Sequence, residues 1–213
     1  MEEHYVAARR TARYYTLGAA EEAREVWFVL HGYGQLAAFF LRHFEAIDDG
    51  RRLVVAPEAL SRFYLPGHQR VGASWMTKED RLTEIDDYLA YLNALYDRVF
   101  ETLDRSRVTV HVLGFSQGAA TASRCTTLGR IDADRLILWA GQLAHDLDLV
   151  AHAATLRRLN LTLVVGTDDE FITPKRLAEQ EAILIEHSIP YRLRPFKGDH
   201  RMDTETLTLL ADG

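Results

Sequence analysis

Short apolar runs recur along the chain, separated by longer stretches in which apolar and polar residues alternate at other spacings. A continuous run of β-favouring apolar residues is typical of a strand that is buried on both faces. Such runs occupy residues 25–30, 52–56, 108–113, 135–139, 161–166 and 189–196. Residues 13–18 are more polar and are expected to form a strand at the edge of the sheet.

Helical spacing appears between these runs. Residues 81–102 place Ile85, Leu89 and Leu92 on one face, which predicts a long amphipathic helix. Further helices are expected at residues 36–47, from residue 117 to about 128, and at 149–159, 174–187 and 203–210. Strands and helices therefore alternate nearly throughout, which predicts an α/β fold with a mostly parallel sheet and helices on both of its faces.

Residues 58–79 do not follow this alternation of strands and helices. The segment has weak periodicity and contains Pro66 and Gly67, so we expect a long loop, and long loops in compact domains are often functional. Tyr64, His68 and Trp75 are candidates to line a substrate pocket. The alternative is that these rings only pin the loop to the surface.

Bulk composition narrows the class of protein. The 213 residues suit one domain spanning 1–213, and 47% hydrophobic with 26% charged residues is ordinary for a soluble globular protein. A net charge of −6 leaves no overall basic surface for nucleic acid. The lone cysteine, Cys125, allows no intrachain disulfide and is expected to act as a small buried hydrophobe.

Other classes of site and location are disfavoured as well. The N-terminal residues lack the apolar core of a signal peptide, and no apolar run approaches the length of a membrane span, so we expect a cytoplasmic protein. There is no HExxH motif or Cys/His cluster with ligand spacing, so neither a metal nor a cofactor is expected. A monomer and a homodimer both fit the pattern.

The apolar run at 108–113 leads into Gly114-Phe115-Ser116-Gln117-Gly118, and small residues follow. A strand, then G-x-S-x-G, then a helix is the pattern of a nucleophile elbow, in which a sharp turn lifts the serine hydroxyl clear of the sheet. Side chains at the two glycines would collide with the neighbouring strand and the start of the helix. The alternative is a tight turn in another α/β protein, with Ser116 only capping a helix.

A serine nucleophile needs a base, and the base needs a carboxylate to orient it. In α/β-hydrolases the chain order is serine, acid, histidine, which leaves His187 and His200 as candidate bases. His187 lies near a helix end before a strand, on the side away from such a site, whereas His200 directly follows the last strand. His200 is therefore the expected base. Three candidate acids follow the strand at 161–166: Asp168, Asp169 and Glu170.

An oxyanion site needs two N–H donors. One is expected from Gln117, the residue after the nucleophile. The other is expected from the glycine-containing turn after residues 25–30, with Tyr33 favoured and His31 holding the turn in place.

Four segments together resemble the phospholipase/carboxylesterase family of α/β-hydrolases, which includes bacterial carboxylesterases and acyl-protein thioesterases. They are LHGYG at 30–34, GFSQGAA at 114–120, GTDDEFI at 166–172 and a Gly-x-His turn at 198–200. The resemblance covers about residues 25–210. It implies the α/β-hydrolase fold, places the acid of its G-x-x-D pattern on Asp169, and makes Tyr33, the residue after HG, the second oxyanion donor.

The resemblance implies a serine hydrolase that cleaves small-molecule carboxylic esters or thioesters through an acyl-enzyme. No inserted lid is evident between residues 139 and 161, so we expect an open site for short to medium acyl groups. Gln35 stands where the family often has an acid, a departure that bears on the substrate. The alternatives are a dienelactone-type or amide-cleaving hydrolase, or a non-catalytic ligand-binding homologue; dienelactone hydrolases usually carry cysteine at the elbow.

Overall fold

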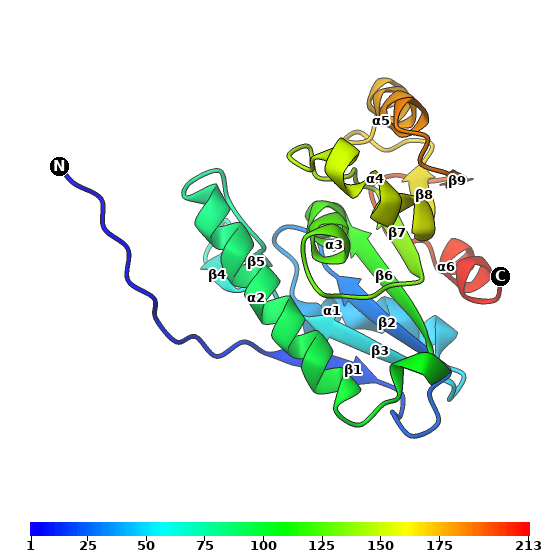
Figure 1. Ribbon diagram of the computed structural model, residues 1–213, viewed down its shortest axis with the longest axis horizontal. Coiled ribbons are helices and arrows are strands. Elements are labelled where there is room, and N and C mark those ends of the chain that lie inside the picture. The colour runs from blue at the N-terminus through cyan, green and yellow to red at the C-terminus, as the bar shows by residue number, and fades with distance from the viewer.

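The computed structural model describes residues 1–213, and a seven-stranded sheet lies at its centre (Figure 1). The strand order is β1-β3-β2-β6-β7-β8-β9. The strands are β1 (Tyr14–Leu17), β2 (Glu25–Leu30), β3 (Arg52–Pro57), β6 (Thr109–Phe115), β7 (Arg135–Trp139), β8 (Asn160–Gly166) and β9 (Tyr191–Phe196). Only β1 runs antiparallel to its neighbour, so the prediction of a mostly parallel sheet is confirmed.

Helices cover both faces of this sheet, as predicted. On one face lie α2 (Arg81–Phe100), α3 (Gln117–Thr127), α4 (Leu149–Arg158) and α5 (Pro174–Glu186). On the other lie α1 (Ala37–Phe40), the 3-10 helix η1 (Leu41–Ile47) and α6 (Thr204–Ala211). A second 3-10 helix, η2 (Arg105–Arg107), precedes β6. No helix is both long enough and apolar enough to cross a membrane.

Two apolar layers hold these elements together. Successive side chains of a strand point to opposite faces, so in β2 Trp27 packs into the layer under α6 while Phe28 packs into the layer under α2. Cys125 is fully buried in the layer under α2, and burial raises the pKa of its thiol. This placement confirms the expectation of a structural cysteine.

The expectation of a long loop at 58–79 is wrong. The segment forms an antiparallel hairpin of β4 (Ser61–Tyr64) and β5 (Val71–Ser74), with Gly67 at φ +86° and His68 at φ +56° in its turn. Each strand has only four residues, too few for a clear alternating pattern. The helix predicted at 36–47 also differs, because its first turn is α-helical and the rest is a 3-10 helix.

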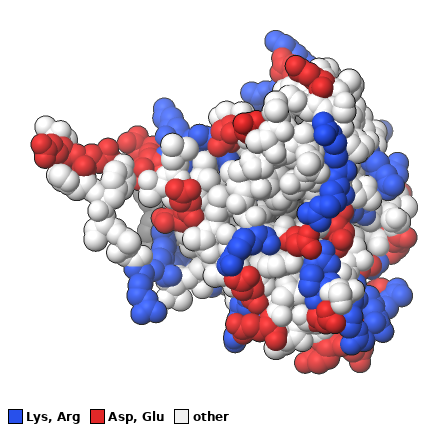
Figure 2. All heavy atoms as spheres, in the orientation of Figure 1, with Lys and Arg blue, Asp and Glu red and all other residues white.

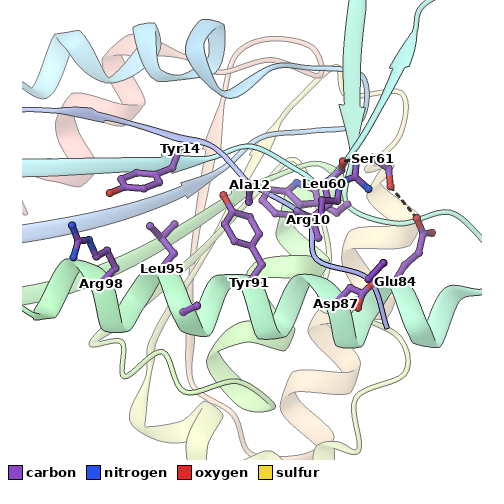
Figure 3. Close-up of a pocket in the computed structure, with 13 residues that line it drawn as sticks. Arg10, Ala12, Tyr14, Leu60, Ser61, Glu84, Asp87, Tyr91, Leu95 and Arg98 are labelled. Atoms are coloured by element: carbon purple, nitrogen blue, oxygen red, sulfur yellow. Dashed lines mark hydrogen bonds between the residues drawn. The ribbon is translucent and has the colours of Figure 1, made fainter. Parts of the chain in front are cut away.

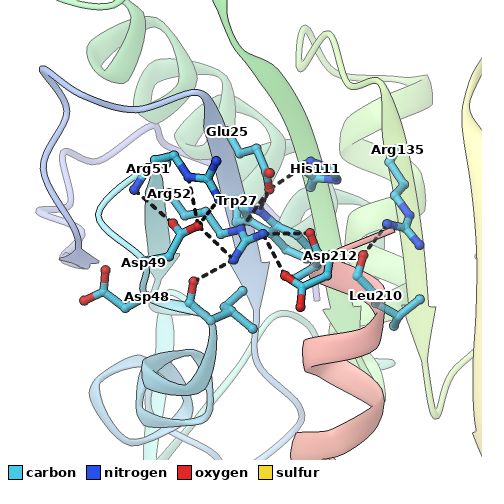
Figure 4. Close-up of polar contacts among 12 residues, drawn as sticks. Glu25, Trp27, Asp48, Asp49, Arg51, Arg52, His111, Arg135, Leu210 and Asp212 are labelled. Carbon is cyan, nitrogen blue, oxygen red and sulfur yellow. Dashed lines mark hydrogen bonds and ion pairs between the residues drawn. The ribbon is translucent and has the colours of Figure 1, made fainter.

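A polar cluster at the opposite end of the sheet from the strand carboxyl ends anchors α6 (Figure 4). Buried Arg52 donates to the carbonyl of Ala211 at 2.8 Å and pairs with Glu25 and Asp212, both at 3.2 Å. Arg135 donates to the carbonyl of Leu210 at 2.7 Å. Cations at a helix C-terminus satisfy its free carbonyls and its dipole, so these two arginines fix α6, which follows the β9 loop.

His111 belongs to the same region. Its ring stacks on Trp27 with the centroids 4.3 Å apart, and its Nε2 lies 3.5 Å from a Glu25 carboxylate oxygen. Burial lowers the pKa of His111 well below its ordinary value of 6.5; Glu25 opposes this shift and Arg135 adds to it. The native fold therefore holds this imidazole neutral near pH 7.

The surface shows no large area of one charge on the face in Figure 2, where basic and acidic residues intermingle. The N-terminal segment extends away from the body and has no regular structure before β1 (Figure 1). A groove of about 480 Å³ lies between this segment and α2 (Figure 3). Tyr91 lines it and donates to the carbonyl of Arg13 at 3.0 Å, which ties the base of the segment to the helix.

Candidate active site

The turn between β6 and α3 is sharp, and Ser116 sits in it at φ +54° and ψ −117°. This region of conformation is strained for a residue with a side chain. A Cβ at Gly114 would lie 2.1 Å from the carbonyl oxygen of Gly118, and one at Gly118 would lie 2.2 Å from that of Leu30. Both glycines are therefore required by the close approach of α3 and β2, for the reason the sequence suggested.

Ser116, His200 and Asp169 form one hydrogen-bonded chain, although 84 residues separate the first two in sequence. The distance from Ser116 Oγ to His200 Nε2 is 2.9 Å, and that from His200 Nδ1 to Asp169 Oδ2 is 2.8 Å. An ionised carboxylate only accepts, so His200 Nδ1 carries the hydrogen toward Asp169, and Nε2 is left to accept from the serine hydroxyl. The order is that of a nucleophile, a base and an orienting acid.

The structure distinguishes between the candidate acids. Asp169 is buried, and its second oxygen, Oδ1, accepts from the N–H groups of Phe171 and Ile172 at 2.8 and 2.9 Å. Asp168 is exposed and its carboxylate is turned toward the Thr167 hydroxyl at 3.3 Å. Only Asp169 contacts His200, because the turn after β8 directs the two neighbouring side chains apart.

Packing fixes the loop that carries His200. The imidazole lies beside Phe115 and Phe171, with ring centroids 5.1 and 4.6 Å away. The Asp168 N–H donates to the carbonyl of Gly198 at 2.8 Å, which pins the acid loop to the histidine loop. His187, the other late histidine, caps the C-terminal end of α5, away from this cluster.

The turn after β2 brings a free N–H toward the same edge of the sheet. The Gly32 N–H donates to Gln35 Oε1 at 2.7 Å and the Gly34 N–H donates to the carbonyl of Ala73 at 2.9 Å, whereas the Tyr33 N–H between them makes no hydrogen bond. The Gln117 N–H opens α3, where an N–H has no acceptor within the helix. These are the two N–H groups that the sequence favours as oxyanion donors, and that role stays a prediction.

His31 lies below this turn and is fully buried. Its Nε2 accepts from the Ala59 N–H at 3.1 Å and its Nδ1 lies 2.8 Å from the Gly32 carbonyl oxygen. Burial lowers the pKa of His31, so the ring is neutral and can accept at one nitrogen while it donates at the other. Its contacts hold the turn, in line with the expected structural role.

The side chain of Gln117 joins the elbow to the hairpin, a link that sequence reasoning missed. It accepts from the Trp75 N–H at 3.1 Å and donates to the Met76 carbonyl at 2.7 Å and to Ser74 Oγ at 3.1 Å. The side-chain amide of the residue directly after the serine therefore joins the start of α3 to the end of β5 and the two residues that follow it.

The pocket candidates from the sequence do not gather at one site. Trp75 is only 2% exposed, and its indole N–H donates to the His31 carbonyl at 2.8 Å, so it supports the turn from within the core. Tyr64 and His68 lie on the exposed end of the hairpin, with ring centroids 6.1 Å apart. A cavity of about 470 Å³ opens beside Gly34 and is lined by none of these three.

No protein-family model matches the sequence, and no curated protein matches it. Solved structures do match. Acyl-protein thioesterase 2 of Zea mays has a TM-score of 0.73 at 17% identity, covering 95% of this chain and 97% of that one. Esterase PE8 has a TM-score of 0.74 at 21% identity, also covering 95% and 97%. This chain has the α/β-hydrolase fold.

A third structure, the carboxylesterase from Mesorhizobium loti, has a TM-score of 0.71 at 20% identity and covers 95% of both chains. The predicted fold class is therefore confirmed over nearly the whole chain. Between β7 and β8 the chain has only a loop and α4. No group of three or more His, Cys, Asp or Glu side chains is placed to hold a metal ion.

Proposed function

We propose that this protein is a serine hydrolase of the phospholipase/carboxylesterase family that cleaves carboxylic esters or thioesters of short to medium acyl groups. The hydrogen-bonded chain from Ser116 through His200 to Asp169 carries the proposal. The names of the similar structures, which are esterases and a thioesterase, support it. The proposed catalytic unit is a single domain spanning 1–213.

Acylation begins when Ser116 Oγ attacks the carbonyl carbon of the substrate. His200 Nε2 takes the hydroxyl proton, and Asp169 stabilises the imidazolium that forms. The negative charge on the former carbonyl oxygen is met by the N–H groups of Tyr33 and Gln117 and by the positive end of α3. When the tetrahedral intermediate collapses, the bond to the alcohol or thiol breaks and the leaving group takes the proton from His200.

Deacylation repeats these steps with water as the nucleophile. His200 takes a proton from water as its oxygen attacks the acyl carbon. The second intermediate then releases the carboxylic acid, and Ser116 recovers its proton from the imidazolium. Every group in the mechanism belongs to the protein, so the proposal needs no cofactor.

The N–H donors have backbone positions fixed before substrate arrives. Neighbouring hydrogen bonds immobilise the turn around Tyr33, and α3 fixes Gln117. Removing one donor from such a site typically lowers turnover by about 10²–10³-fold. We therefore expect preorganisation of the turn to matter nearly as much as the three side chains.

The test measures hydrolysis of p-nitrophenyl esters with acyl chains from acetate to laurate by the wild type and by Ser116→Ala. We expect activity on the shorter esters and a loss of at least about 10⁴-fold in the variant. Ser106→Ala, which alters an exposed serine outside the site, is the control and should retain wild-type rates. A folded wild type that cleaves no ester, or a Ser116→Ala variant of undiminished rate, would contradict the proposal, and cleavage of anilides alone would favour an amide hydrolase.

A further inference from the structure

A cavity of about 470 Å³ lies between the turn after β2, helix α1 and the tip of the β4–β5 hairpin. Its size falls within the range of roughly 300–1,000 Å³ that is usual for small-molecule sites. Five of its nine lining residues are apolar: Leu36, Phe39, Phe40, Leu65 and Val71. The other four are Gly34, Gln35, His43 and Arg70. No step of the proposed mechanism uses these side chains.

The cavity adjoins the turn that carries Tyr33, one of the two proposed oxyanion donors. Gly34 and Gln35 line it, and they directly follow Tyr33, whose N–H is free. Leu65 reaches across from the hairpin to this turn, since a Cβ placed on Gly34 would lie 3.3 Å from a Leu65 methyl carbon. When the carbonyl oxygen of the substrate accepts from the Tyr33 N–H, the acyl chain attached to that carbonyl therefore lies next to the cavity.

Several large side chains around the cavity are exposed. Phe39 is 59% exposed, Val71 is 37% exposed and Tyr33 is 60% exposed. Neighbouring exposed apolar groups of this size often mark a ligand or partner site. Because these groups lie beside the turn that carries the proposed oxyanion donor, the molecule expected to contact them is the substrate.

The side on which the leaving group departs decides which part of the substrate lies in the cavity. His200 must protonate the leaving group, and it follows β9, which lies beyond β7 and β8 from the elbow strand β6. The turn after β2 and the hairpin lie on the other side of β6 (Figure 1). The leaving group therefore departs on the β9 side, and the acyl chain is left on the side of the cavity.

We propose that this cavity binds the acyl chain of the substrate, an unbranched aliphatic group, and that Leu65 at the hairpin tip limits the length it accepts. The inference rests on the proposed esterase function and adds the acyl site to it. Each methylene buried there should raise kcat/KM by about fourfold until the cavity is full.

The experiment compares Leu65→Trp, which fills the cavity from the hairpin tip, and Val71→Phe, which fills it from β5, with Leu65→Ala, which enlarges it. Leu209→Trp is the matched control, because Leu209 is an exposed leucine on α6 and is 70% exposed. The readout is the ratio of kcat/KM for p-nitrophenyl octanoate to that for the acetate. A second series of acetate esters with lengthening alcohols reports on the leaving-group side.

We expect both filling variants to lower the octanoate-to-acetate ratio at least tenfold, and Leu65→Ala to shift the optimum to longer acyl chains. The control and the alcohol series should keep their wild-type profiles. The inference is overturned if the filling variants, folded by circular dichroism, keep the wild-type ratio, or if the alcohol series changes instead. Failure of the esterase proposal looks different, because the wild type would then cleave no ester or Ser116→Ala would remain active.

Discussion

Replacing Asp169 with asparagine changes one charge and almost no volume, and the structure predicts which way the new amide faces. The carboxylate oxygen Oδ1 accepts from the N–H groups of Phe171 and Ile172, while Oδ2 faces His200. An asparagine has one accepting oxygen and one donating NH₂ group. Its oxygen must take the position between the two N–H donors, so the NH₂ group must point at His200.

This orientation of the amide changes the tautomer of the His200 imidazole. Nδ1 of His200 must then accept from the amide, so the ring hydrogen moves to Nε2, the nitrogen that should take the proton of Ser116. A wrong tautomer of this kind costs about 10⁴-fold in kcat in a serine protease triad, equivalent to about 5 kcal/mol of barrier. We expect a loss of that order in Asp169→Asn, with KM changed by no more than a few-fold.

The assay is steady-state hydrolysis of the best p-nitrophenyl ester, with thermal unfolding to confirm that the variant folds. Asp168→Asn is the matched control, since the same substitution one residue earlier alters an exposed carboxylate with no contact to His200. It should keep nearly full activity. If Asp169→Asn kept more than a tenth of wild-type kcat, or if Asp168→Asn were the damaging change, the reasoning on the amide orientation would be refuted.

Three further predictions concern the surroundings of the site and the core. Gly118→Ala should destabilise the protein by at least about 2 kcal/mol in urea unfolding, because its Cβ would overlap the carbonyl of Leu30; an unchanged midpoint would contradict this. Gln117→Leu should lower kcat/KM roughly 10–100-fold by releasing the hairpin at Met76, and wild-type kinetics would show that the tether is dispensable. The folded-state pKa of His111 lies below its ordinary 6.5. The contribution of the neutral ring to the free energy of unfolding is therefore fully present above pH 6.5 and falls as the pH drops below that value. His111→Phe, which keeps a ring on Trp27, should lose less stability between pH 7 and 5 than the wild type, and an equal loss would contradict this.

The sequence was most informative where burial was complete. Continuous apolar runs such as Glu25–Leu30 identified the central strands, because both faces of each are covered. Chain order and the position of His200 directly after the last strand led to the candidate base. Each apolar run is visible in a single segment, and the chain order needs only the linear sequence.

Features that depend on pairing between distant segments were not predictable. The hairpin strands are four residues long, and β5 gains support from the turn after β2, through Gly34 and Gln35 bonded to Ala73. The sequence pattern makes Trp75 a pocket candidate and does not show its buried role, because the partner of its indole N–H, the His31 carbonyl, lies 44 residues away. Spacing alone could not choose between Asp168 and its neighbour, since the choice depends on the backbone direction after β8.

The nucleophilic role of Ser116 is tested most directly by covalent labelling. An activated serine oxygen attacks the phosphorus of a fluorophosphonate and takes up the phosphonyl group. Fluoride leaves, and the serine proton passes to the base. Intact-mass spectrometry of the wild type should show one adduct per chain, and peptide mapping should place it on Ser116, whereas Ser116→Ala should remain unlabelled. An unlabelled wild type, or equal labelling of the variant, would contradict the assignment of Ser116 as the nucleophile.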